Sequence, residues 1–285
     1  MKSKYLSVKW LIIMNTVLIL LSSIFAIIVH ALMPVSVDIT DFDSILVKWF
    51  GFPAVATFYF IILFTQCALA VRFIGVRADV PKFQIGIRFG ISFAMIYILG
   101  MQEVVIEGSP FSTWGLDFVR YQFINGIGDG IPAVLLCFAI AYFTLSKRER
   151  SKPIHKLKST ECLKAIVIFA IAIFTERAIG YQVGLITSDI ATFPVQCYIW
   201  TSLLGILIGY IYVLLYPLFV FNRNKTLSFI VTIGLNWMIF NIFIGLIMKG
   251  VMPQMIIRSG LDIVMMFVAS VVVDKYIFKI RHCTE

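Results

Sequence analysis

The chain has 285 residues, a formal net charge of +9 and a mean hydropathy of +0.97; 60% of its residues are hydrophobic and 14% are charged. A soluble domain carries about 25% charged residues, so this composition excludes an ordinary soluble enzyme or nucleic-acid-binding domain. The positive charge does not indicate nucleic acid either, because most basic residues lie between apolar stretches on one side of them, as the positive-inside rule predicts.

Apolar stretches follow one another along the chain, each long enough to cross a bilayer core of ~30 Å as a helix. Lipid offers no partners for backbone polar groups, so each stretch is predicted to be an α-helix. The sequence thus predicts an all-α, polytopic transmembrane helix bundle of about eight spans. The predicted spans are 10–33, 49–71, 89–107, 121–145, 165–187, 195–221, 227–248 and 256–278.

The connecting segments alternate in charge. The 34–48 segment is acidic, whereas the 72–88 and 146–164 segments are basic. With an even number of spans, both termini are therefore predicted to be cytoplasmic, in a bacterial cytoplasmic membrane. The first stretch is longer than a signal-peptide core and is interpreted as an uncleaved span. The 146–164 segment is basic enough to attract anionic lipid.

The two halves of the chain resemble each other. Phe52-Pro53 opens the second predicted span and Phe193-Pro194 opens the sixth, while Asp129 and Asp262 lie at similar depths in the fourth and eighth. These matches are consistent with a parallel repeat of four plus four spans; the alternative is coincidence among apolar helices. The predicted organisation is a first membrane half at 1–145, a basic linker at 146–164 and a second half at 165–285.

Small residues predict where helices approach closely. Glycines recur at i,i+4 spacing in four spans, as Gly86/Gly90, Gly126/Gly130, Gly180/Gly184 and Gly205/Gly209. Such pairs allow the backbones of neighbouring membrane helices to touch.

The fourth span contains three glycines and a proline between Asn125 and Pro132, around Asp129. These residues weaken a continuous helix. A broken helix there would free backbone groups for a site near mid-membrane, as in many transporters. The alternative is a packed kink in which Asp129 pairs with a neighbouring helix.

The fifth span carries adjacent charges at Glu176 and Arg177. Each costs roughly 2.5–3.5 kcal/mol at the bilayer centre by insertion scales, so each needs a partner or a function. Because neighbours on a helix point about 100° apart, the two are not expected to pair with each other. The predicted partners of Arg177 are Asp129 and Glu103; the alternative role is a structural ion pair.

Other polar residues within the spans are predicted to lie toward the same, outer side of the membrane. Glu103 and Glu107 share a helix face, Arg258 can pair with Asp262 one turn later, and His30 is predicted to be interfacial. Together the charges predict a polar cavity open to the outside. The proposed substrate-binding residues are Glu103, Asn125, Asp129, Glu176, Arg177 and Asp262.

The function predicted from the sequence is a transporter or permease for a small solute, coupled to protons or cations. Acids outnumber arginines in the predicted site, which favours cations or amine-bearing solutes over anions. The alternatives are a membrane enzyme acting on lipid or peptide at the outer leaflet and a non-catalytic sensor, immunity or assembly protein. No HExxH, GxSxG, P-loop or dinucleotide motif is present, and no cofactor or metal is indicated. The expected partners are the bilayer and the solute, without nucleic acid; the sequence does not fix the oligomeric state.

Overall fold

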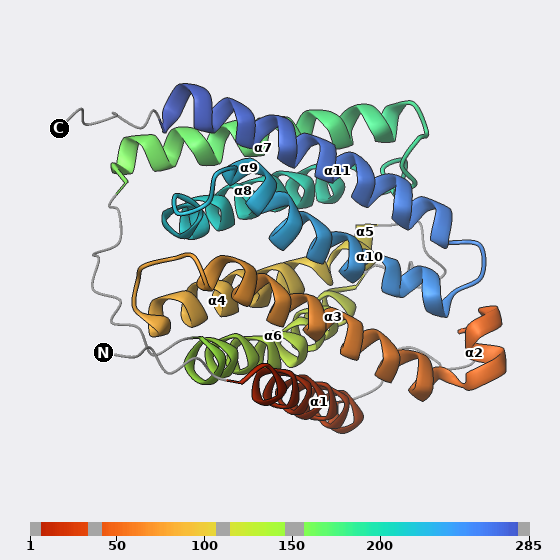
Figure 1. Cartoon of the computed structure of the whole chain (residues 1–285). Coiled ribbons are helices and arrows are strands. Elements are labelled where there is room, and N and C mark those ends of the chain that lie inside the picture. Colours follow the sequence, from red (N-terminus) through yellow and green to blue (C-terminus); the bar gives the residue numbers. More distant parts are fainter. Residues whose placement is uncertain (1–6, 34–41, 107–114, 146–156, 279–285) are drawn as a thin grey trace.

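The computed structural model describes residues 7–33, 42–106, 115–145 and 157–278. These residues form helices and connecting turns, with no strand among them. The long helices lie side by side in one bundle, with both chain ends at the same end of it (Figure 1). They are α1 (Val8–Leu32), α3 (Phe52–Gly75), α4 (Lys82–Gly100), α6 (Leu116–Thr144), α7 (Ser159–Gln182), α8 (Pro194–Phe219), the continuous α9–η2–α10 (Lys225–Phe229, Ile230–Gly234 and Leu235–Ile247) and α11–η3 (Met252–Val272 and Val273–Ile277). Two short helices, α2 (Ile45–Phe50) and α5 (Glu103–Ile106), join them.

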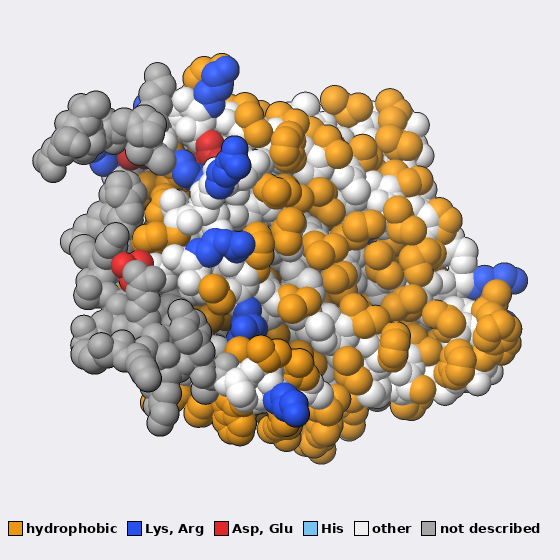
Figure 2. Space-filling view, viewed as in Figure 1, with side chains coloured by type: hydrophobic (Ala, Val, Ile, Leu, Met, Phe, Trp, Pro, Cys, Tyr) orange, Lys and Arg blue, Asp and Glu red, His pale blue; other side chains and the backbone are white. Residues whose placement is uncertain are grey.

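The bundle is that of a membrane protein. Seven of its helices are long and apolar enough to cross a bilayer; α7, which carries Glu176 and Arg177, is not among the seven. Figure 2 shows hydrophobic side chains over most of the visible surface, with most Lys and Arg near the end that holds the chain termini. The predicted all-α membrane bundle is therefore confirmed at this level, with seven spans identified by length and composition rather than eight.

Local sequence explains where several helices begin. The Ser7 and Ser44 side chains accept hydrogen bonds from backbone N–H groups in the first turns of α1 and α2. Helices α3 and α8 begin at the two Phe–Pro dipeptides, because proline fits the first helical turn. Several helices start earlier than predicted, and the difference is largest for α4, at Lys82 instead of 89, and α7, at Ser159 instead of 165, since their first turns contain polar residues that lower the hydropathy.

The glycines mark two tight helix pairs. A Cβ added at Gly126 would lie 2.4 Å from the Ile98 Cα, so α6 and α4 are in backbone contact there. A Cβ at Gly205 would lie 2.8 Å from the Ala170 Cα, which gives the same close contact between α8 and α7. Gly184 differs, because it lies past the end of α7 with φ of +68° and has open space around it.

The expected break in the fourth span is not present. Helix α6 is continuous from Leu116 to Thr144, with Pro132 inside it. Its glycines serve close packing instead: Gly126 and Gly130 face α4, and Gly128 faces Val29 and Met33 of the α1 region. The predicted close approach at Gly126 and Gly130 is confirmed, whereas the predicted break is wrong, because this packing holds the helix together despite the glycines.

The helices are arranged in two layered halves. Helices α1 and α6 form one side of the bundle in Figure 1, and α7 and α11 form the opposite side. Between them, α3 and α4 of the first half meet α10 and α8 of the second. A continuous apolar core fills this middle region, including Tyr97, Phe169 and Tyr212.

Candidate functional site

The Arg177 side chain is fully buried and lies at the centre of a charge cluster. Its Nε and Nη2 atoms donate to the two carboxylate oxygens of Asp262 at 2.8 and 2.7 Å. This two-point geometry joins α7 to α11 and is the strongest form of an arginine–carboxylate contact. The remaining guanidinium nitrogen, Nη1, donates to Glu103 Oε2 at 2.9 Å.

Glu103 brings the first half of the chain into the cluster. It lies at the start of the short helix α5, directly after α4 ends. Its Oε2 atom also lies 3.4 Å from Arg258 Nη1, so this carboxylate contacts two guanidiniums at once. Arg258 is 2% exposed and Glu103 is 3% exposed, so both charges are removed from solvent by the bundle.

Neutral donors complete the surroundings of the ion pairs. Trp237 Nε1 donates to Asp262 Oδ2 at 2.7 Å, which fixes the carboxylate from the α10 side. Tyr181, one turn after Arg177, lies 3.4 Å from Arg177 Nη1 and 3.1 Å from the Thr201 hydroxyl on α8. Side chains of five helices, α5, α7, α8, α10 and α11, therefore hold the cluster in place.

Glu176 is the exception within the cluster. Its Oε2 atom is 3.9 Å from Arg177 Nε, and neither of its buried oxygens accepts a hydrogen bond from a described donor. Its carboxyl group interacts electrostatically with Asp262 and lies within hydrogen-bonding reach of it. Two acids this close are disfavoured when both are ionised, so a proton or a cation stabilises the pair.

The charges in the cluster do not cancel. Glu103, Glu176 and Asp262 supply three negative charges when ionised, and the two arginines supply two positive charges. An uncompensated charge away from water is costly. The arrangement therefore favours the uptake of one positive charge, and Glu176 is the acid with the fewest protein partners.

Asp129 lies outside this cluster. Its Oδ1 atom is 2.6 Å from His30 Nε2, and Asn125, one turn earlier in α6, forms a second side-chain hydrogen bond with His30. The predicted pair of Arg177 with Asp129 is therefore wrong, whereas the alternative partner Glu103 is confirmed. The reason is helix adjacency, since α6 packs against α1, α3 and α4, and α7 packs against α8 and α11.

His30, expected at the interface, lies in the last turn of α1, where it pairs with the buried Asp129 and stacks on Phe60, with 26% of its side chain exposed. Arg258 was expected to pair with Asp262 in its own helix, but among the described residues it pairs with Glu103, because Arg177 already occupies both oxygens of Asp262. Glu107 lies outside the described residues.

A neutral polar network occupies the middle of the bundle. Asn236 Nδ2 donates to Gln66 Oε1 at 2.8 Å and to the Tyr97 hydroxyl at 3.0 Å. Gln66 Nε2 in turn donates to the backbone oxygens of Val231 and Thr232 in η2, where the π-helix alters the regular hydrogen-bond pattern. This network connects α3 and α4 to the second half of the chain.

Among the described residues, the space at the cluster is much smaller than the outward cavity that the sequence predicted. The space that reaches Glu103 and Arg258 has a volume of about 20 Å³, roughly that of a single water. Among the described residues, no group of three or more His, Cys, Asp or Glu is arranged to hold a metal ion. The described helices thus enclose the cluster.

Comparison with protein families, curated proteins and solved structures found no match to this chain. The site therefore has to be judged from its own chemistry. Four of the six predicted site residues, Glu103, Glu176, Arg177 and Asp262, come together, while Asn125 and Asp129 form a separate pair site with His30. Sequence analysis missed Trp237 and Tyr181, because an aromatic residue in an apolar stretch gives no indication of a polar partner.

Proposed function

We propose that this membrane protein is a transporter for a small cationic or amine-bearing solute, coupled to protons or cations through the buried charge cluster. The observation that carries this proposal is Glu176, a buried carboxylate without a hydrogen bond from a described donor, in a cluster with one excess acid. An ion pair that only fixes packing is most stable when its charges balance. An excess acid inside a membrane bundle is instead the arrangement expected of a proton or cation site.

The proposal includes eight spans with both termini cytoplasmic. Helix α7 is included as a span because it packs against α8 and α11 and because both chain ends lie at the same end of the bundle (Figure 1). That end also carries most of the visible Lys and Arg side chains (Figure 2), as expected for the cytoplasmic side.

A parallel repeat of four plus four helices is also part of the proposal. In the first half α1 packs against α3 and α6, and α4 packs against α6; in the second half α7 packs against α8 and α11, and α10 packs against α11. The contacts between halves, α3 with α10 and α4 with α8, exchange under a two-fold axis. The tight glycine contacts do not follow this pattern, because they join α4 to α6 and α7 to α8.

The ion pairs agree with the proposed repeat better than the glycine contacts do. A basic residue on the first helix of each half pairs with an aspartate on the fourth: His30 with Asp129, and Arg177 with Asp262. These pairs occupy equivalent positions in the two halves and support a common architecture.

Topology is tested by cysteine labelling in a background with Cys162 and Cys283 replaced by Ser. Thr187→Cys should react with an impermeant thiol reagent in intact cells, and Asn224→Cys should react only after permeabilisation. Both positions are exposed in the connecting segments at opposite ends of the bundle. The reverse labelling would refute the proposed orientation.

Transport is tested in proteoliposomes that contain a pH-sensitive dye, with a panel of inorganic cations and small amines outside. The expected result is a proton or cation flux with at least one member of the panel, lost in Glu176→Gln. Asp117→Asn, an exposed acid at the start of α6, is the matched control and should retain the flux. Absence of flux from folded wild-type protein across the panel would contradict the proposal.

A second candidate, a membrane protein without turnover, is favoured by α6. The helix is continuous and Asp129 is 1% exposed, so the element expected to form a transport site is instead packed. If the protein has no turnover, wild-type protein should show no flux in proteoliposomes. Glu176→Gln should then leave every cellular phenotype of the wild-type protein intact.

A further inference from the structure

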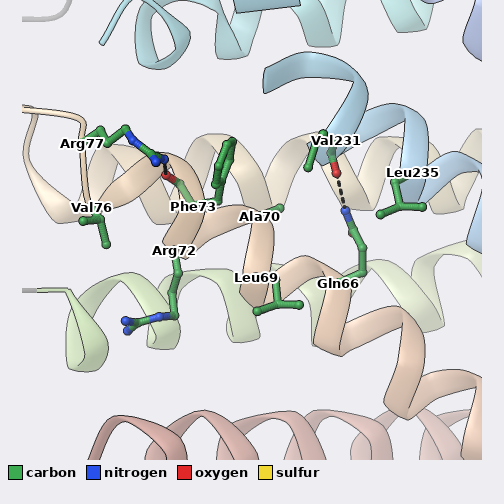
Figure 3. A pocket seen from close by; sticks show the side chains of 9 residues that line it. All are labelled: Gln66, Leu69, Ala70, Arg72, Phe73, Val76, Arg77, Val231 and Leu235. Atoms are coloured by element: carbon green, nitrogen blue, oxygen red, sulfur yellow. Dashed lines mark hydrogen bonds between the residues drawn. The ribbon is translucent and has the colours of Figure 1, made fainter. Parts of the chain in front are cut away.

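A groove on the outer surface of the bundle lies between α3 and the η2–α10 segment. Its volume is about 520 Å³. Figure 3 shows the side chains around it, from Gln66 at one end to Arg77 at the other. The lining residues are Gln66, Leu69, Ala70, Arg72, Phe73, Val76, Arg77, Val231 and Leu235.

The long walls of the groove are apolar and open to the surroundings. Leu69 and Phe73 of α3 are exposed, as are Val231 and Leu235 across the gap. At the inner end, the Gln66 amide is already bonded to the backbone of η2 at Val231 and Thr232 (Figure 3). A ligand in the groove therefore meets hydrocarbon along most of its length.

The other end of the groove is cationic. Arg77 is exposed, donates to the Phe73 backbone oxygen at 2.8 Å, and holds its guanidinium 4.7 Å from the Phe73 ring centroid. Arg72 donates to the Thr144 backbone oxygen at 3.0 Å at the end of α6. A guanidinium has five N–H donors, so the contact with Phe73 leaves donors of Arg77 for a phosphate.

We infer that this groove binds an anionic phospholipid, with the phosphate at Arg77 and one acyl chain along Leu69, Val231 and Leu235. Charge selects this occupant, because basic side chains next to a membrane attract anionic headgroups by ~1 kcal/mol each. The apolar length behind Arg77 requires a ligand with a hydrocarbon tail, which a free phosphate lacks. The site is independent of the proposed transport function, and its lining residues do not belong to the 146–164 segment.

The test uses the purified full chain in detergent, with phosphatidylglycerol and phosphatidylcholine of identical acyl chains, and native mass spectrometry to count retained lipid. Wild-type protein should retain phosphatidylglycerol several-fold more than phosphatidylcholine. Arg77→Gln should lower phosphatidylglycerol retention about five-fold, which corresponds to ~1 kcal/mol for one charge, and leave phosphatidylcholine unchanged. Leu235→Trp, which fills the apolar length, should lower retention of both lipids.

Matched controls separate this groove from general lipid contact. Arg223→Gln removes another exposed charge outside the groove, and Ile171→Trp enlarges an exposed apolar side chain on α7; both should behave as wild type. Arg77→Lys should retain part of the preference, which would show that charge and not misfolding explains Arg77→Gln. Equal retention of the two lipids by wild type, or equal loss in Arg223→Gln and Arg77→Gln, would overturn the inference.

Discussion

The Arg177–Asp262 and His30–Asp129 pairs, which correspond under the proposed repeat, differ in chemistry. Arg177 keeps its charge at any physiological pH and contacts two carboxylates, whereas His30 is an imidazole that contacts one. Arg177 is fully buried, while 26% of the His30 side chain is exposed. The second half thus holds a permanent charge cluster, and the first half holds a hydrogen-bonded pair that tolerates either charge state of the ring.

Because the two pairs differ in this way, removing Arg177 and removing His30 should cost different amounts of stability. Without Arg177, Asp262 loses its guanidinium and Glu103 keeps only Arg258, whereas without His30 only Asp129 loses a partner. Breaking a buried ion pair from one side is the more expensive event, because the remaining charge has no water to solvate it.

The largest expected effect is that of Arg177→Gln, on the order of 3–5 kcal/mol of stability. Thermal unfolding in detergent, followed by the monodisperse fraction on size exclusion, measures it. Adding Asp262→Asn should restore part of the loss, because it removes one of the stranded charges. Adding Asp129→Asn should restore nothing; equal rescue by the two aspartate variants would erase the distinction between the pairs.

The aspartates themselves give the next largest contrast. Asp262 accepts hydrogen bonds from Arg177 Nε, Arg177 Nη2 and Trp237, and an asparagine would turn its NH2 group toward one of these donors. Asp262→Asn is therefore expected to cost about 2–3 kcal/mol and Asp129→Asn about 1 kcal/mol in the same unfolding assay. The opposite order would mean that the first half holds the more important pair.

A smaller effect is expected from His30→Gln. The amide retains a hydrogen-bond donor for Asp129, so the loss should be about 1 kcal/mol or less. His30→Ala, which removes the donor and the stacking on Phe60, should cost more. A loss from His30→Gln as large as that from Arg177→Gln would show that the imidazole is charged and as essential as the guanidinium.

The smallest expected change in stability is that of Glu176→Gln. This carboxylate accepts no hydrogen bond from a described donor and adds to the excess negative charge, so neutralising it should leave the melting temperature unchanged or raise it slightly. The same variant is expected to abolish the flux in proteoliposomes. A strong destabilisation would instead assign Glu176 a structural role in the ion pairs.

Much of the site could be predicted because intramembrane charge is rare in a sequence of this composition. Glu103, Glu176, Arg177 and Asp262 were selected for that reason, and they do converge. The partners were predicted less well, because pairing depends on which helices are neighbours and how each is rotated. Asp129 was predicted as a partner of Arg177, although α6 packs against α1, α3 and α4.

His30 and the shape of α6 were missed for related reasons. A histidine at the end of a span has no property in the sequence that separates an interfacial ring from a partner of Asp129. Its correspondence with Arg177 under the proposed repeat was the available indication. The glycines of α6 indicated both a break and close packing, and the packing on α4 decides their role.

The sequence by itself determined the helical membrane bundle, most helix limits and the residues too costly to bury without a partner, because these follow from hydropathy and backbone hydrogen bonding in lipid. Only the tertiary structure decided the pairs: Asp262 and Glu103 with Arg177, and His30 with Asp129. It also decided that α6 stays continuous and that the cluster is enclosed. These outcomes depend on contacts between distant segments, which are set by how side chains of several helices fit together at once.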